Sequence, residues 1–368
     1  MSQLLKDLYT TDFLNSFARF LQQEIKTFPS AQFTRQVTAD NWPELELKQR
    51  MKRISTVMHQ YMPGNFAAAS QILLRLIDRL EADGFRGNSI EFIFLPDYIE
   101  TYGIDDYDTA IPAMERCTCF MTCEFAVRPF LKKYGTRMVK QMDRWSRHPH
   151  AHVRRLASEG MRPRLPWAMA VDFLKKDPSG ILPILERLKN DPEEFVRRSV
   201  ANNINDIAKD HPEVVLKLIR EWKGFSEQTD ALLKHGSRTL FKKGHPEVLK
   251  LFGWGNNKDI QLVSFTLQKA SVKIGQPLPF AVQLRNKSAK QQAARIEYAI
   301  YYRLKKGDFG KKVFKVSETM IAPGNTLLIE RQHSFRPITT RVYYPGLHEI
   351  SIIVNGIELE RESFKLLK

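Results

Sequence analysis

Charged side chains in the middle of the chain are the groups that could do chemistry. Glu124 is the only charged residue between Arg116 and Arg128, in a stretch of cysteine, threonine and apolar residues. A carboxylate in such surroundings is either paired or perturbed, and perturbed carboxylates gather at functional sites. Two interpretations stay open: a functional carboxylate, or a structural ion pair with an arginine of a neighbouring helix.

A second group of candidates follows between residues 148 and 167. Arg155 and Glu159 are four residues apart, so on a helix they point the same way. Arg162, Arg164 and Trp167 come within the next eight residues. A surface ion pair would be worth only about 0.2–0.5 kcal/mol. The nearby tryptophan and the density of arginines favour a binding role over a purely solvated face.

The elements that must carry these residues are helical up to about residue 257. Apolar residues at three- and four-residue spacing predict a helix that ends near Asp83, and further helices over about 112–133 and 136–147. From residue 148 the sequence repeats itself. Asp-Pro or His-Pro pairs begin at residues 177, 211 and 245, each 34 residues after the last. Paired helices with periods of 34 to 47 residues are typical of a HEAT-like solenoid.

A longer period of 43 residues relates the two arginine pairs of the solenoid. Val153-Arg154-Arg155 matches Val196-Arg197-Arg198. A helical wheel places Val153 on the packing face and Arg154, Arg155, Ser158, Glu159 and Arg162 on the opposite one. In the second repeat, the same helical wheel predicts that Arg198, Asn202 and Asn205 point away from the core and that Asp206 lies at the edge of the packing face. Arginines repeated on one face suit a phosphate backbone, although an arginine on the seam between repeats is equally common.

After residue 257 the helical spacing of apolar residues gives way to short segments in which apolar and polar residues alternate, the pattern of β-strands. About seven strands, separated by turns such as Asn355-Gly356, predict an immunoglobulin-like β-sandwich over residues 258–368. The chain is therefore expected to be mainly α, with a HEAT-like helical domain over 1–257 and the sandwich over 258–368. Lys305 and Lys306 fall in one hairpin, which either binds a partner or guards an edge strand.

The charge of the chain is segregated. It carries 57 Lys and Arg against 41 Asp and Glu, a net charge of +16. Residues 1–135 are nearly balanced, whereas 258–368 carry 19 basic and 9 acidic side chains. A polyanionic partner is the usual reason for such a bias, and a generally basic, solvated surface is the alternative.

Several functional classes are not supported by the sequence. It shows no membrane span and no signal-peptide core, and its three clustered cysteines suggest a reducing compartment. The cysteine and histidine runs lack zinc-ligand spacing, so no metal is expected. Walker, H-E-x-x-H, G-x-S-x-G and G-x-G-x-x-G patterns are absent, which argues against nucleotide hydrolysis, metalloprotease, hydrolase and dinucleotide chemistry.

The solenoid with His-Pro-His-Ala-His-Val-Arg-Arg-Leu-Ala-Ser-Glu-Gly at 148–160 and Arg-Pro-Arg-Leu-Pro-Trp at 162–167 resembles the DNA alkylation-repair glycosylases. The AlkC branch fits better than its AlkD sister, because the long N-terminal region and the C-terminal immunoglobulin-like domain also match. The resemblance covers nearly the whole chain. It implies a monofunctional, cofactor-free glycosylase that removes N3-alkylated bases, 3-methyladenine and 3-methylcytosine, from double-stranded DNA in the bacterial cytoplasm, as a monomer.

The resemblance also implies roles for individual residues. Glu124, Glu159 and Asp206 would be the catalytic carboxylates, with Trp167 and Arg155 contacting the substrate. The 43-residue offset pairs Glu159 with Asn202, so Asp206 rests on the resemblance alone. DNA contacts are expected from Arg154, Arg162, Arg164, Arg197, Arg198, Lys305 and Lys306. The competing hypotheses are a non-catalytic DNA-binding scaffold and a solenoid that binds an acidic protein.

Overall fold

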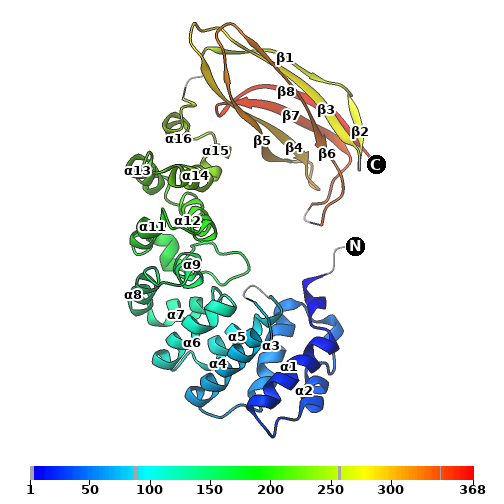
Figure 1. Ribbon diagram of the computed structural model, residues 1–368. Coiled ribbons are helices and arrows are strands. Elements are labelled where there is room, and N and C mark those ends of the chain that lie inside the picture. Colours follow the sequence, from blue (N-terminus) through cyan, green and yellow to red (C-terminus); the bar gives the residue numbers. More distant parts are fainter. Residues whose placement is uncertain (1–3, 87–89, 256–257, 340) are drawn as a thin grey trace. The chain divides into compact units, whose positions relative to one another are not determined.

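The structure is a computed structural model that describes residues 4–86, 90–255, 258–339 and 341–368 (Figure 1). Its α-helices are α1 (Thr11–Glu24), α2 (Ser30–Val37), α3 (Leu47–His59), α4 (Phe66–Ala82), α5 (Phe94–Tyr102), α6 (Tyr107–Phe120), α7 (Val127–Tyr134), α8 (Thr136–Trp145), α9 (Ala151–Glu159), α10 (Asp172–Lys176), α11 (Leu182–Leu188), α12 (Glu194–Ile207), α13 (Pro212–Trp222), α14 (Glu227–Gly236), α15 (Arg238–Lys242) and α16 (Pro246–Leu251). Its strands are β1 (Ile260–Leu267), β2 (Ser271–Lys273), β3 (Pro277–Asn286), β4 (Gln292–Arg303), β5 (Phe309–Ile321), β6 (Thr326–Ser334), β7 (Gly346–Val354) and β8 (Ile357–Leu367). The expected mainly α chain with a C-terminal immunoglobulin-like sandwich is confirmed.

The chain forms two compact units. One comprises Met1–Asp210 and Ser226–Leu232, and the other comprises His211–Phe225 and Leu233–Lys368. The second unit thus contains α13, α15 and α16 together with the strands. The expected domain boundary at residue 257 lies outside the described residues and stays a prediction. Within the described ranges, no helix is both long enough and apolar enough to span a bilayer.

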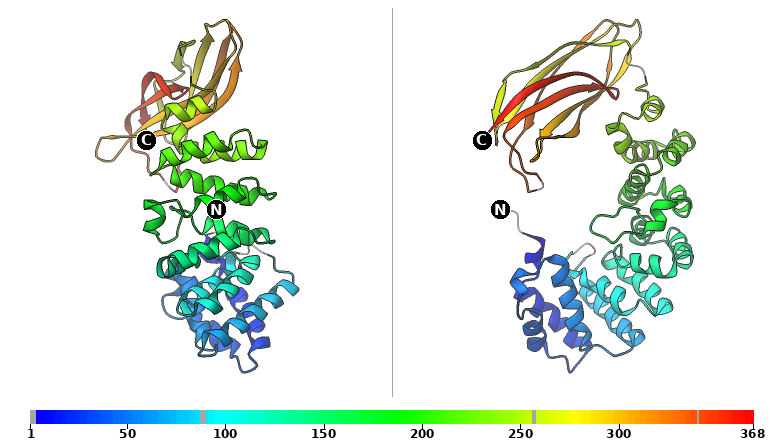
Figure 2. Two further views of the ribbon diagram at one scale, coloured as in Figure 1. Left: turned by 90° about the vertical axis from the view of Figure 1, so that its left-hand side faces the viewer. Right: turned by 180° about the vertical axis from the view of Figure 1, so that it is seen from behind.

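The helices of the first unit follow one another in chain order and pack on their neighbours (Figure 2). α9 packs against α8 on one side and α12 on the other, so it is buried nearly all round. The wheel correctly placed Val153 in the core, but the prediction for its opposite face was wrong. Ser158 and Glu159 are buried as well, because the next repeat covers them. Asn205 and Asp206 of α12 are buried as well, and Asp206 is paired with Arg162 from the segment that follows α9.

The 43-residue repeat appears in the structure as a repeated contact. Arg154 Nη1 donates to the carbonyls of His148 and Pro149, at 3.1 and 2.7 Å. Arg197 Nη1 donates in the same way to the carbonyls of Asp191 and Pro192, at 2.5 and 2.8 Å. The matched arginines therefore hold the chain that leads into their own helices.

The helix expected over 112–133 is wrong as a single element. It ends at Phe120, and α7 begins only at Val127. Between them, Thr118 Oγ1 accepts a hydrogen bond from the backbone N–H of Cys123, and Thr122 Oγ1 accepts one from that of Glu124. Threonine side chains that bond to nearby backbone groups compete with helical bonds. Glu124 consequently lies in a turn and not on an apolar helix.

The strands form two sheets that share one core. The first has the order β1-β3-β6 and the second β2-β8-β7-β4-β5, with β2 and β8 parallel and the other pairs antiparallel. Both expected residues of the Asn355-Gly356 turn have positive φ, as a two-residue hairpin between twisted strands requires. The three-residue β2 was not expected, because so short a segment gives no alternating pattern.

The second sheet packs its β4 strand against the last helices within the second unit. The Arg295 guanidinium lies 4.5 Å from the ring centre of Phe241 and 5.3 Å from that of Trp254. The same arginine pairs with Glu297 at 2.6 Å and with Glu318 at 2.5 Å. These helices and the strands therefore share buried aromatic and charged contacts.

Candidate active site

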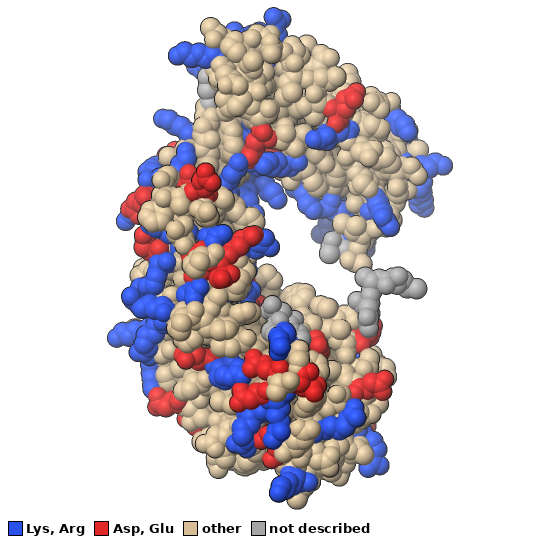
Figure 3. Space-filling view, in the orientation of Figure 1, with Lys and Arg blue, Asp and Glu red and all other residues tan. Residues whose placement is uncertain are grey.

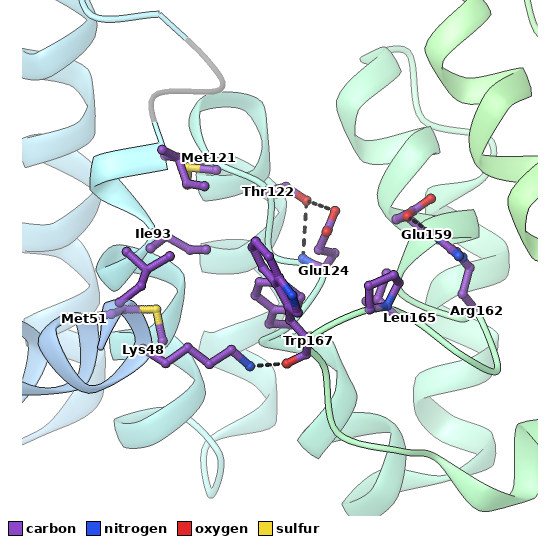
Figure 4. Close-up of a pocket in the computed structure, with 14 residues that line it drawn as sticks. Lys48, Met51, Ile93, Met121, Thr122, Glu124, Glu159, Arg162, Leu165 and Trp167 are labelled. Carbon is purple, nitrogen blue, oxygen red and sulfur yellow. Dashed lines mark hydrogen bonds and ion pairs between the residues drawn. The ribbon is translucent and has the colours of Figure 1, made fainter. Parts of the chain in front are cut away.

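A cavity of about 300 Å³ lies in the first unit where four segments meet (Figure 4). These segments are the start of α3, residues 90–93 before α5, the turn between α6 and α7, and the stretch from the end of α9 to residue 167. Most of the wall is apolar, formed by Leu47, Met51, Ile90, Ile93, Met121, Phe125, Leu165, Pro166 and Trp167. Polar groups enter it from Lys48, Thr122, Glu124, Glu159 and Arg162. An apolar hollow with a few convergent charges is the usual form of a ligand or active site.

The turn between α6 and α7 presents Glu124 to this cavity. Its Oε2 accepts hydrogen bonds from Arg155 Nη1 at 2.8 Å and from Thr122 Oγ1 at 3.2 Å. The ion pair joins the turn to α9. Glu124 thus has the arginine partner from a neighbouring helix that the ion-pair interpretation expected. It also lines the cavity, so the interpretation as a functional carboxylate stays open.

Glu159 is placed by α9, which α12 holds in position. Ser199 Oγ donates to Ser158 Oγ at 3.0 Å, and the side-chain amide of Asn203 donates to the Ser158 carbonyl at 2.9 Å. The Glu159 side chain is only 6% exposed, and its Oε1 accepts from Arg162 Nη1 at 2.7 Å. Among the described residues its buried Oε2 has no hydrogen-bond partner. One carboxylate oxygen is thus held by Arg162, and the other is buried without a hydrogen-bond partner among the described residues.

A row of alternating charges connects the three expected carboxylates. Arg155 Nη1 contacts Glu124, and its Nη2 lies 3.8 Å from Glu159 Oε1. Arg162 then bridges Glu159 and Asp206, the latter through its Nε at 2.9 Å. Burial by itself lowers the pKa of Arg162, but the attraction of the two carboxylates outweighs it and raises that pKa above its usual value. Asp206 does not line the cavity and reaches it only through Arg162.

Trp167 forms one wall of the cavity and is also 65% exposed to solvent. Its φ is +62°, in the left-handed region that only glycine adopts without strain. Such a conformation in a bulky residue is held by its surroundings. Figure 4 shows Trp167 beside Glu124, with the Lys48 side chain reaching the Trp167 carbonyl.

The residues expected to contact DNA are placed in different ways. Arg162 is buried in the row of charges, and Arg154 is held by two carbonyls and by Asp191 at 2.6 Å. More exposed members of the set pair with acidic neighbours: Arg164 with Asp210, and Arg198 with Glu194. Their roles on DNA stay predictions.

Lys305 and Lys306 are exposed in the turn between β4 and β5 of the second unit. On the face shown in Figure 3, the helices of the first unit carry acidic and basic side chains together, while the strands carry more Lys and Arg. This agrees with the excess of basic residues counted over 258–368.

Several residues of the cavity were not expected from the sequence, notably Lys48, Met51 and Phe125. For Phe125, the only clue in the sequence was its position directly after Glu124. Lys48 lies 119 positions before Trp167, and nothing local in the sequence brings the two together. No group of three or more metal-ligating side chains is found among the described residues.

The comparisons with known proteins agree over the whole chain. A family described as "DNA alkylation repair enzyme" matches residues 97–238, and one described as "Uncharacterised protein YhaZ, C-terminal Ig-like domain" matches residues 261–368. Protein YhaZ of Bacillus subtilis is 41% identical over 352 residues, which are 96% of each chain. The solved structure of Pseudomonas fluorescens alkylpurine DNA glycosylase AlkC, bound to DNA containing an abasic site analog, is 34% identical. It covers 100% of both chains with a TM-score of 0.94.

Proposed function

Because the chain belongs to the AlkC branch of the DNA alkylation repair enzymes, we propose that it is a monofunctional DNA glycosylase. Its substrates are cationic N3-alkylated bases, 3-methyladenine and 3-methylcytosine, in double-stranded DNA. Hydrolysis of the N-glycosidic bond by this chain leaves an abasic site. The observation that carries the proposal is the meeting of Glu124, Glu159 and Trp167 at one cavity, with Asp206 joined to it through Arg162.

The chemistry of the lesion explains why carboxylates suffice. An N3-alkylated base already carries a positive charge, so it departs without a strong general acid. The sugar left behind becomes oxocarbenium-like, and fixed negative charge aimed at it lowers the barrier. Glu159 is suited to this role because its Oε2 has no partner among the described residues, while its Oε1 is held by Arg162. The Glu159 carboxylate, at the wall of the cavity, can also accept the proton of the attacking water.

The remaining residues of the cavity fit a substrate of this kind. The exposed indole of Trp167 can lie against a cationic base, which is worth about 0.5–2 kcal/mol. Arg155 holds Glu124 and offers a guanidinium to a phosphate or to the site itself. No cofactor or metal is needed for this reaction.

A monofunctional enzyme has no lysine that forms a Schiff base with the sugar. Lys48 is the one lysine lining the described cavity. Its side-chain nitrogen is already engaged, because it donates to the Trp167 carbonyl and lies 5.1 Å from the centre of the Phe125 ring. Borohydride added during the reaction should therefore trap no covalent protein–DNA adduct, and a trapped adduct would contradict the monofunctional assignment.

We expect the protein to act as a monomer on the chromosome, in the cytoplasm of a bacterium, as suits a DNA repair enzyme with bacterial relatives. The deciding experiment incubates the purified protein with methylated duplex DNA in the presence of EDTA. Free 3-methyladenine and 3-methylcytosine are then measured, with 7-methylguanine as a comparison lesion. Release supports the proposal, and binding without release identifies the alternative, a non-catalytic DNA-binding scaffold.

A further inference from the structure

The segment from Gly160 to Val171, here called the Trp167 loop, has unusually few hydrogen bonds of its own. Pro163 and Pro166 contribute no backbone N–H. Among the described residues, the backbone bonds that its amides donate are Gly160 N–H to Leu156, Arg162 N–H to Glu159 and Ala168 N–H to Leu165. Backbone carbonyls that face the interior need donors from elsewhere. The loop that presents Trp167 must therefore be held by other parts of the chain.

Arg128 supplies most of those donors from α7. Its Nη1 donates to the carbonyls of Gly160 and Arg162 at 3.0 and 2.8 Å, and its Nε donates to the Met169 carbonyl at 2.6 Å. The residue is 0% exposed, and no carboxylate of the described residues lies within ion-pair distance of it. Burial lowers the pKa of Arg128 to about 10, which still leaves it charged at neutral pH. A buried cation without a carboxylate partner is costly, so its three carbonyl bonds are what retain it.

Lys48 supplies the remaining donor from α3. Its ammonium bonds to the carbonyl of Trp167 and lies over the Phe125 ring (Figure 4). The contact holds the residue with positive φ itself, at the point where the loop departs most from ordinary backbone geometry. Arg128 thus fixes both ends of the loop, and Lys48 fixes its exposed tip.

We propose that Lys48 and Arg128 are positioning residues of the site, which act by holding the Trp167 loop against the carboxylates. The inference rests on the proposed glycosylase function, and it identifies Lys48 and Arg128 as the residues that keep the site in the arrangement needed for excision. Residues 124–128 contact three different parts of the site. Glu124 pairs with Arg155, Phe125 lies under Lys48, and Arg128 bonds to the Trp167 loop. A shift of the loop would consequently move Trp167 and Arg162 relative to Glu124.

The test compares Lys48→Met with Lys52→Met in the full-length protein. Methionine keeps the aliphatic stem of Lys48 over Phe125 but cannot donate to the Trp167 carbonyl. Lys52 is one helical turn further along α3 and contacts Thr101 and Asp97, so its variant controls for the lost charge. Hydrogen exchange of peptides spanning 160–171 reports on the loop without any substrate. Single-turnover excision and DNA affinity are measured on the same samples.

In Lys48→Met we expect faster exchange in the loop and a single-turnover rate about 10-fold lower, with the Kd for DNA changed less than about 2-fold. Lys48→Arg should restore most of the rate, and Lys52→Met should match the wild type in both measurements. Arg128→Lys should loosen the same peptides, because a single ammonium cannot reproduce the separate positions from which Nε and Nη1 of the guanidinium donate to the three carbonyls. If that variant does not fold, Lys48→Met alone decides.

Unchanged exchange in the loop of Lys48→Met would overturn the inference, whatever the excision rate. Faster exchange with an unchanged rate would overturn it too, since the loop would then be held without consequence. If the wild type releases no base at all, the proposed function fails, and the exchange data still show whether Lys48 holds the loop.

Discussion

The guanidinium of Arg162 lies between two carboxylates, with Nη1 2.7 Å from Glu159 Oε1 and Nε 2.9 Å from Asp206 Oδ2. All three side chains are less than a tenth exposed. The two carboxylates come from different repeats, so this arginine joins α9 to α12 electrostatically as well as by packing. Removing it would leave two buried negative charges facing each other.

Arg162→Gln should therefore lower the free energy of unfolding by about 3–5 kcal/mol, the usual cost of unpairing a buried charge. Urea unfolding followed by circular dichroism measures this. Arg164→Gln is the matched control, because Arg164 pairs with Asp210 at the surface and should cost less than about 1 kcal/mol. Equal losses in the two variants would show that burial of the Arg162 pairs is unimportant.

Glu159→Gln and Glu124→Gln should each lower the excision rate, by about 10²–10³ for Glu159, because they remove negative charge from the forming oxocarbenium ion. Binding of DNA that holds an abasic-site analogue should persist. Rates come from single-turnover release of 3-methyladenine, and Glu115→Gln, outside the cavity, serves as control. Wild-type rates in both variants would place the active site elsewhere.

Lys305 and Lys306 should affect DNA affinity through salt. If both contact phosphates, replacing them by alanine reduces the slope of log K against log salt by about 1.8, at about 0.9 per phosphate. Lys311→Ala is the control, because Lys311 already pairs with Glu358 at 2.7 Å. Fluorescence anisotropy over a salt series measures the slopes. A slope unchanged by the double substitution would favour the edge-guarding role of this hairpin.

His333 should make the sandwich sensitive to acid. Its Nδ1 and Nε2 lie 3.0 and 2.8 Å from the hydroxyls of Tyr298 and Tyr302, and burial lowers its pKa to about 4, with Arg341 and Lys312 adding repulsion. A folded-state pKa below the unfolded value gives stability that is present above about pH 6.5 and is lost as the pH falls towards 4.

We therefore expect the second unit to lose about 2 kcal/mol between pH 7 and pH 5. His333→Gln keeps hydrogen-bonding groups toward both tyrosines but cannot take up the proton, so it should flatten this dependence. Urea unfolding at several pH values measures both proteins. A variant with the same pH dependence as the wild type would assign the acid sensitivity to other groups.

The helices that precede the sandwich should be needed for its stability. A fragment of residues 233–368 keeps Phe241 and Trp254 over Arg295, whereas a fragment of 258–368 exposes Arg295 and Glu297. The longer fragment should melt at a higher temperature in differential scanning calorimetry. Equal melting temperatures would show that the sandwich folds without these helices, as the expected boundary at residue 257 implies.

Much of the fold could be predicted because its signals are periodic. The repeated Pro positions and the 43-residue match gave the solenoid, and turn pairs such as Asn355-Gly356 gave the sandwich. The helix over 112–133 was wrong because Thr118 and Thr122 bond to the backbone, a tertiary and local effect that apolar spacing does not report. Burial of Glu159 and Asp206 also escaped the wheel, since one helix cannot show what its neighbour covers.

The residues of the site likewise fall into those that the local sequence could predict and those that it could not. Glu124, Glu159 and Trp167 attracted attention as unusual residue types in their local sequence, and the structure brings them to one cavity. Arg162 was expected at a DNA surface, and instead it is buried between carboxylates. Lys48 could not be expected, because its role depends on a contact with a carbonyl far away in the sequence.

With Trp167 in the proposed role against the base, its left-handed backbone sets stability against catalysis at one position. Strain of this kind costs on the order of 1–2 kcal/mol, and glycine would relieve it. A laboratory selection for heat tolerance alone would thus enrich glycine there and discard the indole. Homologues that retain a large aromatic side chain in this conformation would then be those in which excision has been maintained at the expense of a more robust fold.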